Sequence, residues 1–328
     1  MGPSSFFFAF RLAWRHLIFE KGKFLAAILG VMFACILVFM QLGFRDSLFT
    51  SMAIVPNALN GDIFIQSKNT EAIWRTIPFK RSELMRAYAS PDVTEIHPLY
   101  FAFAPFRNPE NFTKRTIMIY GYAPKSRIFN QPHIIEFQEA LQQKDTVIFD
   151  ITSRPEFGDI KSFLEKTNPL SVEINDYKTN IIGTFILGAS FSADGNIITS
   201  DQNFMRLFPN RNTDDVDIGI IRLKQGTDIQ KTKAQLRALM SNNVHVLDKS
   251  DLAKFEMHYW QTMVPVGFIF GFGVVIGLIV GMVIVYQILY TDIVNHLGEY
   301  ATMKAMGYTH FYLILVVFAS STILAVIG

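Results

Sequence analysis

The histidines and the single cysteine are the residues of this sequence that could bind a metal or act as nucleophiles. There are seven histidines: His16, His97, His133, His245, His258, His296 and His310. None begins an H-E-x-x-H motif, and none is paired with cysteines at the spacing of a zinc site. His296 and Glu299 would share one helical face, but two ligands do not make a metal site. Cys35 is the only cysteine, so no disulfide can form within the chain.

The sequence motifs of nucleotide binding and covalent hydrolysis are also absent. No G-x-x-x-x-G-K-[ST] segment could cradle a nucleotide phosphate, and no G-x-S-x-G segment could form a nucleophile elbow. We therefore predict a protein that is not an enzyme, binds no cofactor or metal itself, and takes its energy from elsewhere.

The segment 291–312, TDIVNHLGEYATMKAMGYTHFY, has more polar character than a simple connection between two apolar runs needs. Its spacing predicts a short helix around Glu299–Met306. We expect this segment to present Glu299, Tyr300, Lys304, Met306 and Tyr308 to the cytoplasm, as a docking surface for a partner would.

Three long segments must position that loop. Residues 24–44, 259–291 and 311–328 contain no Asp, Glu, Lys or Arg, and so offer no carboxylate or amine for an ion relay. We assign transmembrane spans to 24–44 and 263–290, both long enough to cross about 30 Å of hydrocarbon. The third run, 311–328, is marginal in length and continues to the last residue. It predicts a chain truncated at its C-terminus, with the third span incomplete. A cleavable signal peptide is the alternative for the first run, but that run exceeds the usual length and no small-residue cleavage site follows.

Composition and charge agree with spans joined to an aqueous domain. Half of the residues are hydrophobic and 18% are charged, with a mean hydropathy of +0.25. Residues 1–23 carry a net charge of +3, which places the N-terminus in the cytoplasm of a plasma (inner) membrane protein. Residues 45–262 then lie outside and 291–310 inside. The central block is close to neutral, which argues against a nucleic-acid partner.

Residues 5–19, SFFFAFRLAWRHLIF, predict an amphipathic helix at the inner membrane interface, within the N-terminal segment 1–23. Helical spacing puts Arg11 and Arg15 on one face, with Trp14 among the apolar residues. The alternative is a positively charged flank without such a role.

The central block of 45–262 predicts a large α+β domain. Strands are expected at 61–66, 93–100, 114–122, 145–150, 216–224 and 244–248, and a hairpin at 171–188. Helices are expected at 81–89, 133–143 and 228–240. A stalk helix from about residue 249, capped by Ser250, would continue without a break to about Tyr290.

Glycines recur at four-residue spacing in the second span, a pattern that lets another helix backbone come close. These are Gly267, Gly271, Gly273, Gly277 and Gly281. In the first span, Ala26, Gly30 and Ala34 form a similar stripe. The alternative is that glycine is simply frequent in membrane spans.

The loop carries a family resemblance. Residues 299–307 fit E-[IY]-x-x-x-[KR]-A-[MI]-G, the pattern between the second and third spans of MacB/FtsX-type ABC permeases. More narrowly, 286–308, 39–49 and 59–65 resemble the DevC type of cyanobacterial permease. The resemblance covers the chain in order, except that the family has a fourth span. It implies a multi-pass α-helical membrane protein with a large extracytoplasmic domain like the periplasmic core domain of MacB.

The resemblance also implies a function. Such permeases are homodimeric half-transporters driven by a separate cytoplasmic ABC ATPase, which holds the ATP and magnesium. A periplasmic adaptor (membrane fusion protein) and a TolC-like outer-membrane channel are further partners, and the DevC group is associated with export of glycolipids or other envelope material. The residues expected to couple to the ATPase are His296, Glu299, Tyr300, Lys304, Ala305, Met306, Gly307 and Tyr308. Alternatives are an FtsX-like regulator of an extracytoplasmic hydrolase, a lipoprotein-releasing permease, and a ligand sensor.

Overall fold

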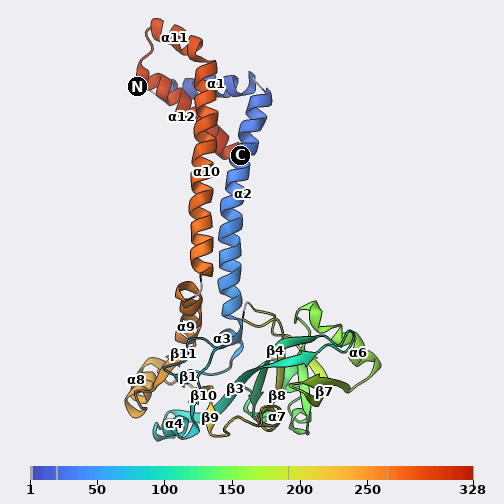
Figure 1. Cartoon of the computed structure of the whole chain (residues 1–328). Coiled ribbons are helices and arrows are strands. Elements are labelled where there is room, and N and C mark those ends of the chain that lie inside the picture. The colour runs from blue at the N-terminus through green and yellow to red at the C-terminus, as the bar shows by residue number, and fades with distance from the viewer. Residues whose placement is uncertain (1–2, 20, 191, 264, 328) are drawn as a thin grey trace. The chain divides into compact units, whose positions relative to one another are not determined.

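The computed structural model describes residues 3–19, 21–190, 192–263 and 265–327, and internal contacts divide the chain into two units (Figure 1). The helical unit comprises Met1–Ser47 and Pro265–Gly328, and the α/β unit comprises Leu48–Val264. Each unit is described by itself.

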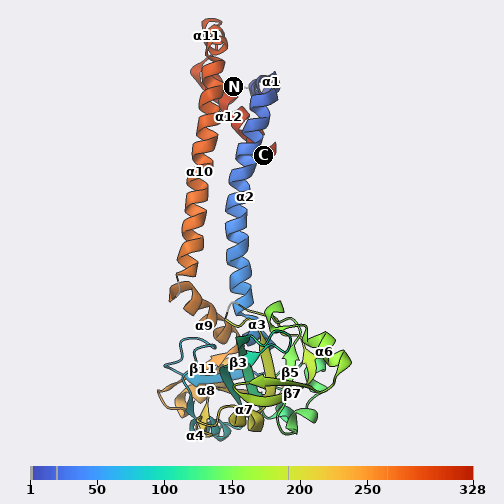
Figure 2. The same cartoon turned by 45° about the vertical axis from the view of Figure 1, so that its right-hand side comes forward.

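The helical unit consists of long apolar helices with two shorter ones at one end. Its elements are α1 (Pro3–Phe19), α2 (Lys21–Met52, whose last turns belong to the α/β unit), α10 (Val266–Asn295), α11 (Leu297–Ala305) and α12 (His310–Ile327). Figures 1 and 2 show α2 and α10 side by side along their length. Helices α1, α11 and α12 gather near the C-terminal end of α10.

Among the described residues, three helices are long and apolar enough to cross a membrane: Lys21–Met52, Gly267–Asn295 and His310–Ile327. Large side chains on these helices, such as Phe39, Phe268 and Phe318, are more than 60% exposed within the chain. An apolar surface of this kind is compatible with lipid rather than with water.

The α/β unit contains the strands. They are β1 (Ile63–Ser67), β2 (Phe79–Lys80), β3 (Val93–Arg107), β4 (Lys114–Tyr122), β5 (Thr146–Asp150), β6 (Leu170–Ile174), β7 (Tyr177–Phe185), β8 (Asn196–Ser200), β9 (Asp215–Val216), β10 (Ile218–Leu223) and β11 (Val244–Asp248). The α-helices are α3 (Ile54–Ala58), α4 (Arg81–Met85), α5 (Pro132–Ile135), α6 (Ile160–Lys166), α7 (Asp201–Leu207), α8 (Ile229–Leu239) and α9 (Lys249–Thr262). Short 3-10 turns cover Arg86–Ala89, Pro124–Ser126, Ala140–Gln142 and Pro155–Phe157.

Strand β3 joins two parts of one sheet whose order is β11-β1-β10-β3-β4-β8-β5-β7-β6. Its first half pairs with β10 and its second half, from Tyr100, pairs with β4. Strand β6 returns to pair with the end of β3, at Phe106 and Arg107. A closed ring is therefore formed by six strands, in the order β3, β4, β8, β5, β7 and β6. The strands β11, β1 and β10 extend from it as an open sheet.

Alternate residues of the same strands enter two separate cores. In β1, Ile63 and Ile65 join one buried cluster and Phe64 joins the other. In β4, Ile119 and Tyr120 divide in the same way. Because successive side chains point to opposite faces of a strand, a sheet that is covered on both sides requires apolar residues at consecutive positions.

Most of the strands predicted from the sequence are present, and the hairpin at 171–188 is formed by β6 and β7. Its turn residues Asn175 and Asp176 both have positive φ, as a two-residue hairpin turn requires.

Three predictions about helices are wrong. The segment 133–143 forms only the single turn α5 and a 3-10 turn. Asp248, not Ser250, caps α9 by accepting a hydrogen bond from the Asp251 amide. The expected continuous stalk is interrupted, because α9 ends at Thr262 and α10 begins after Pro265. Proline has no amide hydrogen and its ring clashes with the preceding turn of a helix.

Candidate functional site

The corner between α10 and α11 is formed by one buried residue, His296, which is 7% exposed. Its Nδ1 lies 2.9 Å from the carbonyl oxygen of Asp292 and 3.4 Å from the carboxylate Oδ1 of the same residue. His296 therefore joins the C-terminal end of α10 to the start of α11 and contacts the last turn of α10. His296 was predicted as one of the residues that couple to an ATPase, and its side chain lies inside the chain.

Tyr300 also faces inward, against prediction. It is 8% exposed and belongs to a cluster with Ala9 and Ala13 of α1 and Val316 and Ala319 of α12. Burial, and then the negative charges of Asp292 and Glu299, raise the pKa of Tyr300 to about 12. The large ring is apolar over most of its area, so helical spacing directs it into this core rather than toward a partner.

The exposed face of α11 and the turn after it holds the other predicted coupling residues. They are Glu299, Lys304, Ala305, Met306, Gly307 and Tyr308. The side chain of Met306 is 65% exposed. The ring of Tyr308 packs 4.9 Å from that of Tyr312 at the start of α12.

Gly307 ends α11 for a conformational reason. Its φ is +94°, a region that residues with a Cβ rarely adopt. The amide of Gly307 donates to the carbonyl of Lys304, and the amide of Tyr308 donates to that of Met303. This pair of hydrogen bonds is a Schellman motif, which closes a helix and turns the chain sharply.

Helix α1 presents the predicted interfacial residues on its outer side. Arg11, Trp14 and Arg15 are exposed within the chain. The opposite side carries Ala9 and Ala13, both fully buried, and α1 packs on α12 through it. The four-residue spacing of these two alanines is the feature of the sequence that could have predicted close packing of α1 on another helix.

Three of the five predicted packing glycines face α2. A Cβ at Gly273 would lie 2.9 Å from the Gln41 side chain. At Gly277 and Gly281 it would lie 3.1 Å from Val38 and from Ala34, respectively.

The other two glycines differ. Apart from its own helix, no described atom lies within 4 Å of a Cβ built at Gly271, because a shift of two residues turns a side chain to another helix face. Gly267 lies in the first turn of α10 and has no such contact described.

The described residues contain no group of three or more His, Cys, Asp or Glu side chains that could hold a metal ion. The geometry instead describes how α11 is packed. One face of α11 is exposed, and the other is packed against α1 and α12.

The comparisons with known proteins find similar solved structures. No family model and no curated protein matches the chain. The periplasmic region of MacB from Actinobacillus actinomycetemcomitans matches with a TM-score of 0.43 at 12% identity, over 60% of this chain and 94% of that chain. The extracellular domain of the ABC-type transporter YknZ from Gram-positive bacteria matches with a TM-score of 0.40 at 14% identity, over 58% and 100%.

Proposed function

We propose that this chain is the permease subunit of an ABC-type exporter of the MacB/FtsX type. A separate cytoplasmic ATPase binds ATP and magnesium and pushes on α11. The helical unit spans the inner membrane as one half of a homodimer, with its N-terminus in the cytoplasm, and the α/β unit works with an adaptor and a TolC-like channel outside. The cargo is lipid, glycolipid or other envelope material.

The burial of Tyr300 is the observation that supports this proposal best. A loop that served only to connect two spans would not need to anchor a tyrosine in a core shared by α1 and α12. Because the ring is packed against both helices, a displacement of α11 must move them or break the cluster. Protein cores are close-packed and transmit such displacements.

The exposed side of α11 supplies the chemistry for a partner. Glu299 and Lys304 carry opposite charges, and Met306 adds an adaptable apolar contact. Closure of the ATPase dimer would bias the helical unit between two packings, which is all that an ATP-driven conformational pump requires.

The test uses the tagged full chain, purified in mild detergent from membranes of its source cell. We expect an ATPase with a Walker A motif to copurify with it. Single Glu299→Ala and Lys304→Ala changes should lower the copurified ATP hydrolysis by about tenfold, as loss of a central interface contact does. Thr302→Ala is the matched control on the same helix, since its hydroxyl donates to the Gly298 carbonyl within α11, at 2.9 Å.

Variants of Tyr300 distinguish binding of the ATPase from coupling of ATP hydrolysis to export. Tyr300→Ala should keep the ATPase bound but abolish export, whereas Tyr300→Phe keeps the ring in the cluster and should export normally. Normal export by the Glu299, Lys304 and Tyr300→Ala variants would refute the proposal. A wall hydrolase bound to the chain, with no cargo exported by the unaltered protein, would instead identify an FtsX-like regulator.

A further inference from the structure

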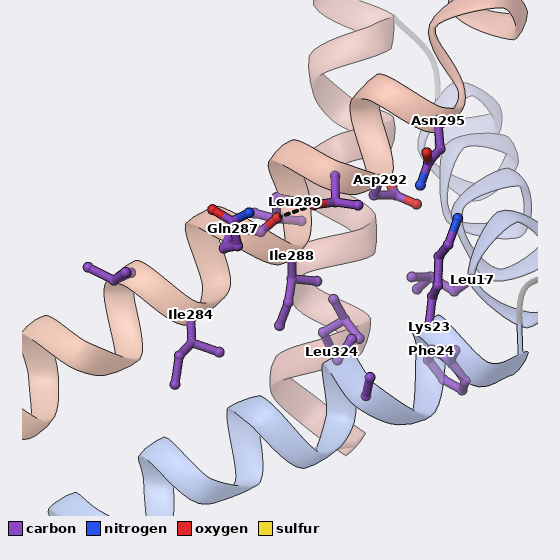
Figure 3. Close-up of a pocket in the computed structure, with 14 residues that line it drawn as sticks. Leu17, Lys23, Phe24, Ile284, Gln287, Ile288, Leu289, Asp292, Asn295 and Leu324 are labelled. Atoms are coloured by element: carbon purple, nitrogen blue, oxygen red, sulfur yellow. Dashed lines mark hydrogen bonds between the residues drawn. The ribbon is translucent and has the colours of Figure 1, made fainter.

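Two hollows of the chain differ in the chemistry of their walls. Figure 3 shows one in the helical unit, whose lining is mainly apolar and includes Phe24, Ile284 and Ile288. Nothing in the described residues shows what lies against it. The other, which we call the polar hollow, has a volume of about 430 Å³ and lies on the surface of the α/β unit. Its lining consists almost entirely of polar and charged residues: Glu95, His97, Ala123, Lys125, Ser126, Arg127 and Arg222.

Arg222 forms the fixed wall of the polar hollow. It lies opposite Glu95 in the pairing of β10 with β3, and its Nη1 donates to the Glu95 carboxylate at 2.9 Å. Its Nη2 donates to the carbonyl oxygens of Ser126 and Arg127, at 2.8 and 2.7 Å. The same carboxylate oxygen of Glu95 lies 2.9 Å from Nε2 of His97. Arg222 therefore holds the turn that follows β4 against the start of β3.

The polar hollow carries a positive charge. Three Lys or Arg side chains and one carboxylate line it, which gives a net charge of +2 with the histidine neutral. The carboxylate is ionised, because the hydrogen bond with His97, and then the charge of Arg222, lower the pKa of Glu95. The two residues of the α/β unit that lie outside the description, Phe191 and Val264, carry no charge. The hollow therefore favours an anion over a cation or a neutral ligand.

Two of the cations, Lys125 and Arg127, are available to such an anion. Both residues are exposed, and in the described part of the chain neither side chain makes a hydrogen bond or an ion pair. They lie two residues apart on the turn that Arg222 holds in place. A ligand can therefore reach both side chains without breaking a contact of the fold.

The conformation of Arg127 shows that this turn is unusual. Arg127 follows the 3-10 turn Pro124–Ser126 and has φ +49° and ψ +42°, the left-handed region that favours glycine. An arginine in this conformation is less favourable than a glycine, and strained positions of this kind gather at binding sites. The position therefore keeps a cationic side chain where the backbone alone would favour none.

The charge and the donors restrict the anion. A phosphate monoester carries a charge of about −1.5 to −2 at neutral pH and has three strong acceptor oxygens. It can therefore match a net charge of +2 and accept from an ammonium and a guanidinium group together. A single carboxylate has two oxygens and one charge, so it would neutralise only half of the hollow.

We propose that the polar hollow binds a phosphate monoester. Lys125 and Arg127 contact the phosphate oxygens, while Arg222 and Glu95 fix the turn that presents them. A soluble molecule and a lipid headgroup can both carry such a group. The inference concerns the α/β unit alone and does not depend on coupling to an ATPase.

The test titrates the full chain, held in phosphatidylcholine nanodiscs, with glycerol 3-phosphate in an isothermal titration calorimeter. We expect saturable binding at one site per chain. Acetate should bind at least about fivefold more weakly, because it carries less charge. Nanodiscs that contain phosphatidic acid distinguish the two sources of the phosphate. Unchanged binding in them identifies a soluble ligand, and lost binding identifies a lipid headgroup.

Variants of the turn link the binding to the polar hollow. Lys125→Gln and Arg127→Gln should each weaken binding about tenfold, as loss of a hydrogen bond to a charged group does. Arg127→Gly removes the same charge but suits the left-handed backbone, so it should weaken binding as much as Arg127→Gln. Lys224→Gln is the matched control, since Lys224 is exposed and does not line the hollow. It should change the affinity by less than about twofold, because exposed charges outside a site are screened.

Glu95→Gln tests the sign of the electrostatic effect. It should tighten binding about fivefold, because it removes a negative charge from the hollow, whereas damage to the fold would weaken binding. Absence of saturable binding, or unchanged affinity in the Lys125 and Arg127 variants, would overturn the proposal. Tighter binding of a hexaglutamate peptide than of glycerol 3-phosphate would also overturn it, in favour of an acidic protein segment. Glu299→Ala should leave the binding unchanged, so failure of ATPase coupling and failure of this site give different results.

Discussion

Glu256 of α9 is a carboxyl group buried inside the α/β unit, with 2% of its surface exposed. Its Oε2 accepts a hydrogen bond of 2.8 Å from the Ile73 amide, and its Oε1 accepts one of 3.1 Å from the Trp260 indole. Burial raises the pKa of Glu256, although these two hydrogen bonds oppose the shift. Ionisation of the Glu256 carboxyl group therefore lowers the stability of the folded α/β unit.

The contribution of Glu256 to the stability of the fold should therefore decrease as pH rises past 4.5, the ordinary value for this carboxyl group. Above that pH the unfolded chain releases the proton while the folded chain keeps it, so the unfolded state is favoured until the folded pKa is passed. One proton changes the free energy of unfolding by at most about 1.4 kcal/mol per pH unit. Relative to Glu256→Gln, the thermal midpoint of the unaltered chain should fall over this window.

Tryptophan fluorescence of the full chain in detergent can follow this unfolding, because Trp74 and Trp260 pack in the same cluster, 5.9 Å apart. Glu136→Gln, at an exposed carboxylate, is the control. An identical pH profile for unaltered and Glu256→Gln chains would contradict the prediction.

Asp217 and Arg211 form a second buried contact. Asp217 is 1% exposed and accepts hydrogen bonds from the Phe101 amide, Thr76 and Arg211. Arg211→Met should lower the free energy of unfolding by about 3 kcal/mol, because it leaves a buried charge without its partner. The double change Arg211→Met with Asp217→Asn should recover part of this loss in the same fluorescence assay. Additive losses would show that the two residues are not coupled.

Among the elements, α10 shows what the sequence could and could not reveal. Its length and apolar character were readable from the absence of charge, and its glycine spacing indicated close packing. The sequence did not indicate which helix α10 packs on, or which face of α10 makes the contact. Gly271 and Gly277 look alike in sequence, but of these two only Gly277 faces α2. Tyr300 was misplaced for a related reason, because a tyrosine is equally compatible with a core and with a surface.

Two glycine variants test that packing. Gly277→Leu should force α2 and α10 apart and lower the stability of the full chain in detergent by about 1–3 kcal/mol, the usual effect of overpacking. Gly271→Leu adds the same side chain to the same helix and should have little effect on stability within one chain. Equal loss of thermal stability in both variants would show that the α2–α10 contact is not formed as described.

The strands of the α/β unit were easier to predict than its helices. Runs rich in Ile, Val, Phe and Tyr fit a doubly covered sheet, whereas 133–143 has helical spacing without forming a long helix. There, Phe137 packs over Gly183 of β7, which has no room for a Cβ. A tertiary contact of this kind overrides local propensity and leaves no mark within the segment itself.

For the whole molecule, the orientation across the membrane is the property on which the proposed function depends most. Cys35 is the only cysteine, so Cys35→Ala gives a cysteine-free background. We expect a membrane-impermeant maleimide to label Lys125→Cys from outside intact cells, and Lys304→Cys only in inverted vesicles. Detergent should expose both positions. Labelling of Lys304→Cys from outside would reverse the topology and remove the basis for coupling to a cytoplasmic ATPase.

The continuity of strand β3 restricts how the α/β unit can move internally. The same continuous backbone serves the open sheet at Ile96 and the closed ring at Phe106. A hinge movement of the open sheet against the closed ring would have to bend β3 and break its backbone hydrogen bonds to the neighbouring strands. The α/β unit should therefore tilt or turn as one rigid body, without a hinge between the open sheet and the closed ring.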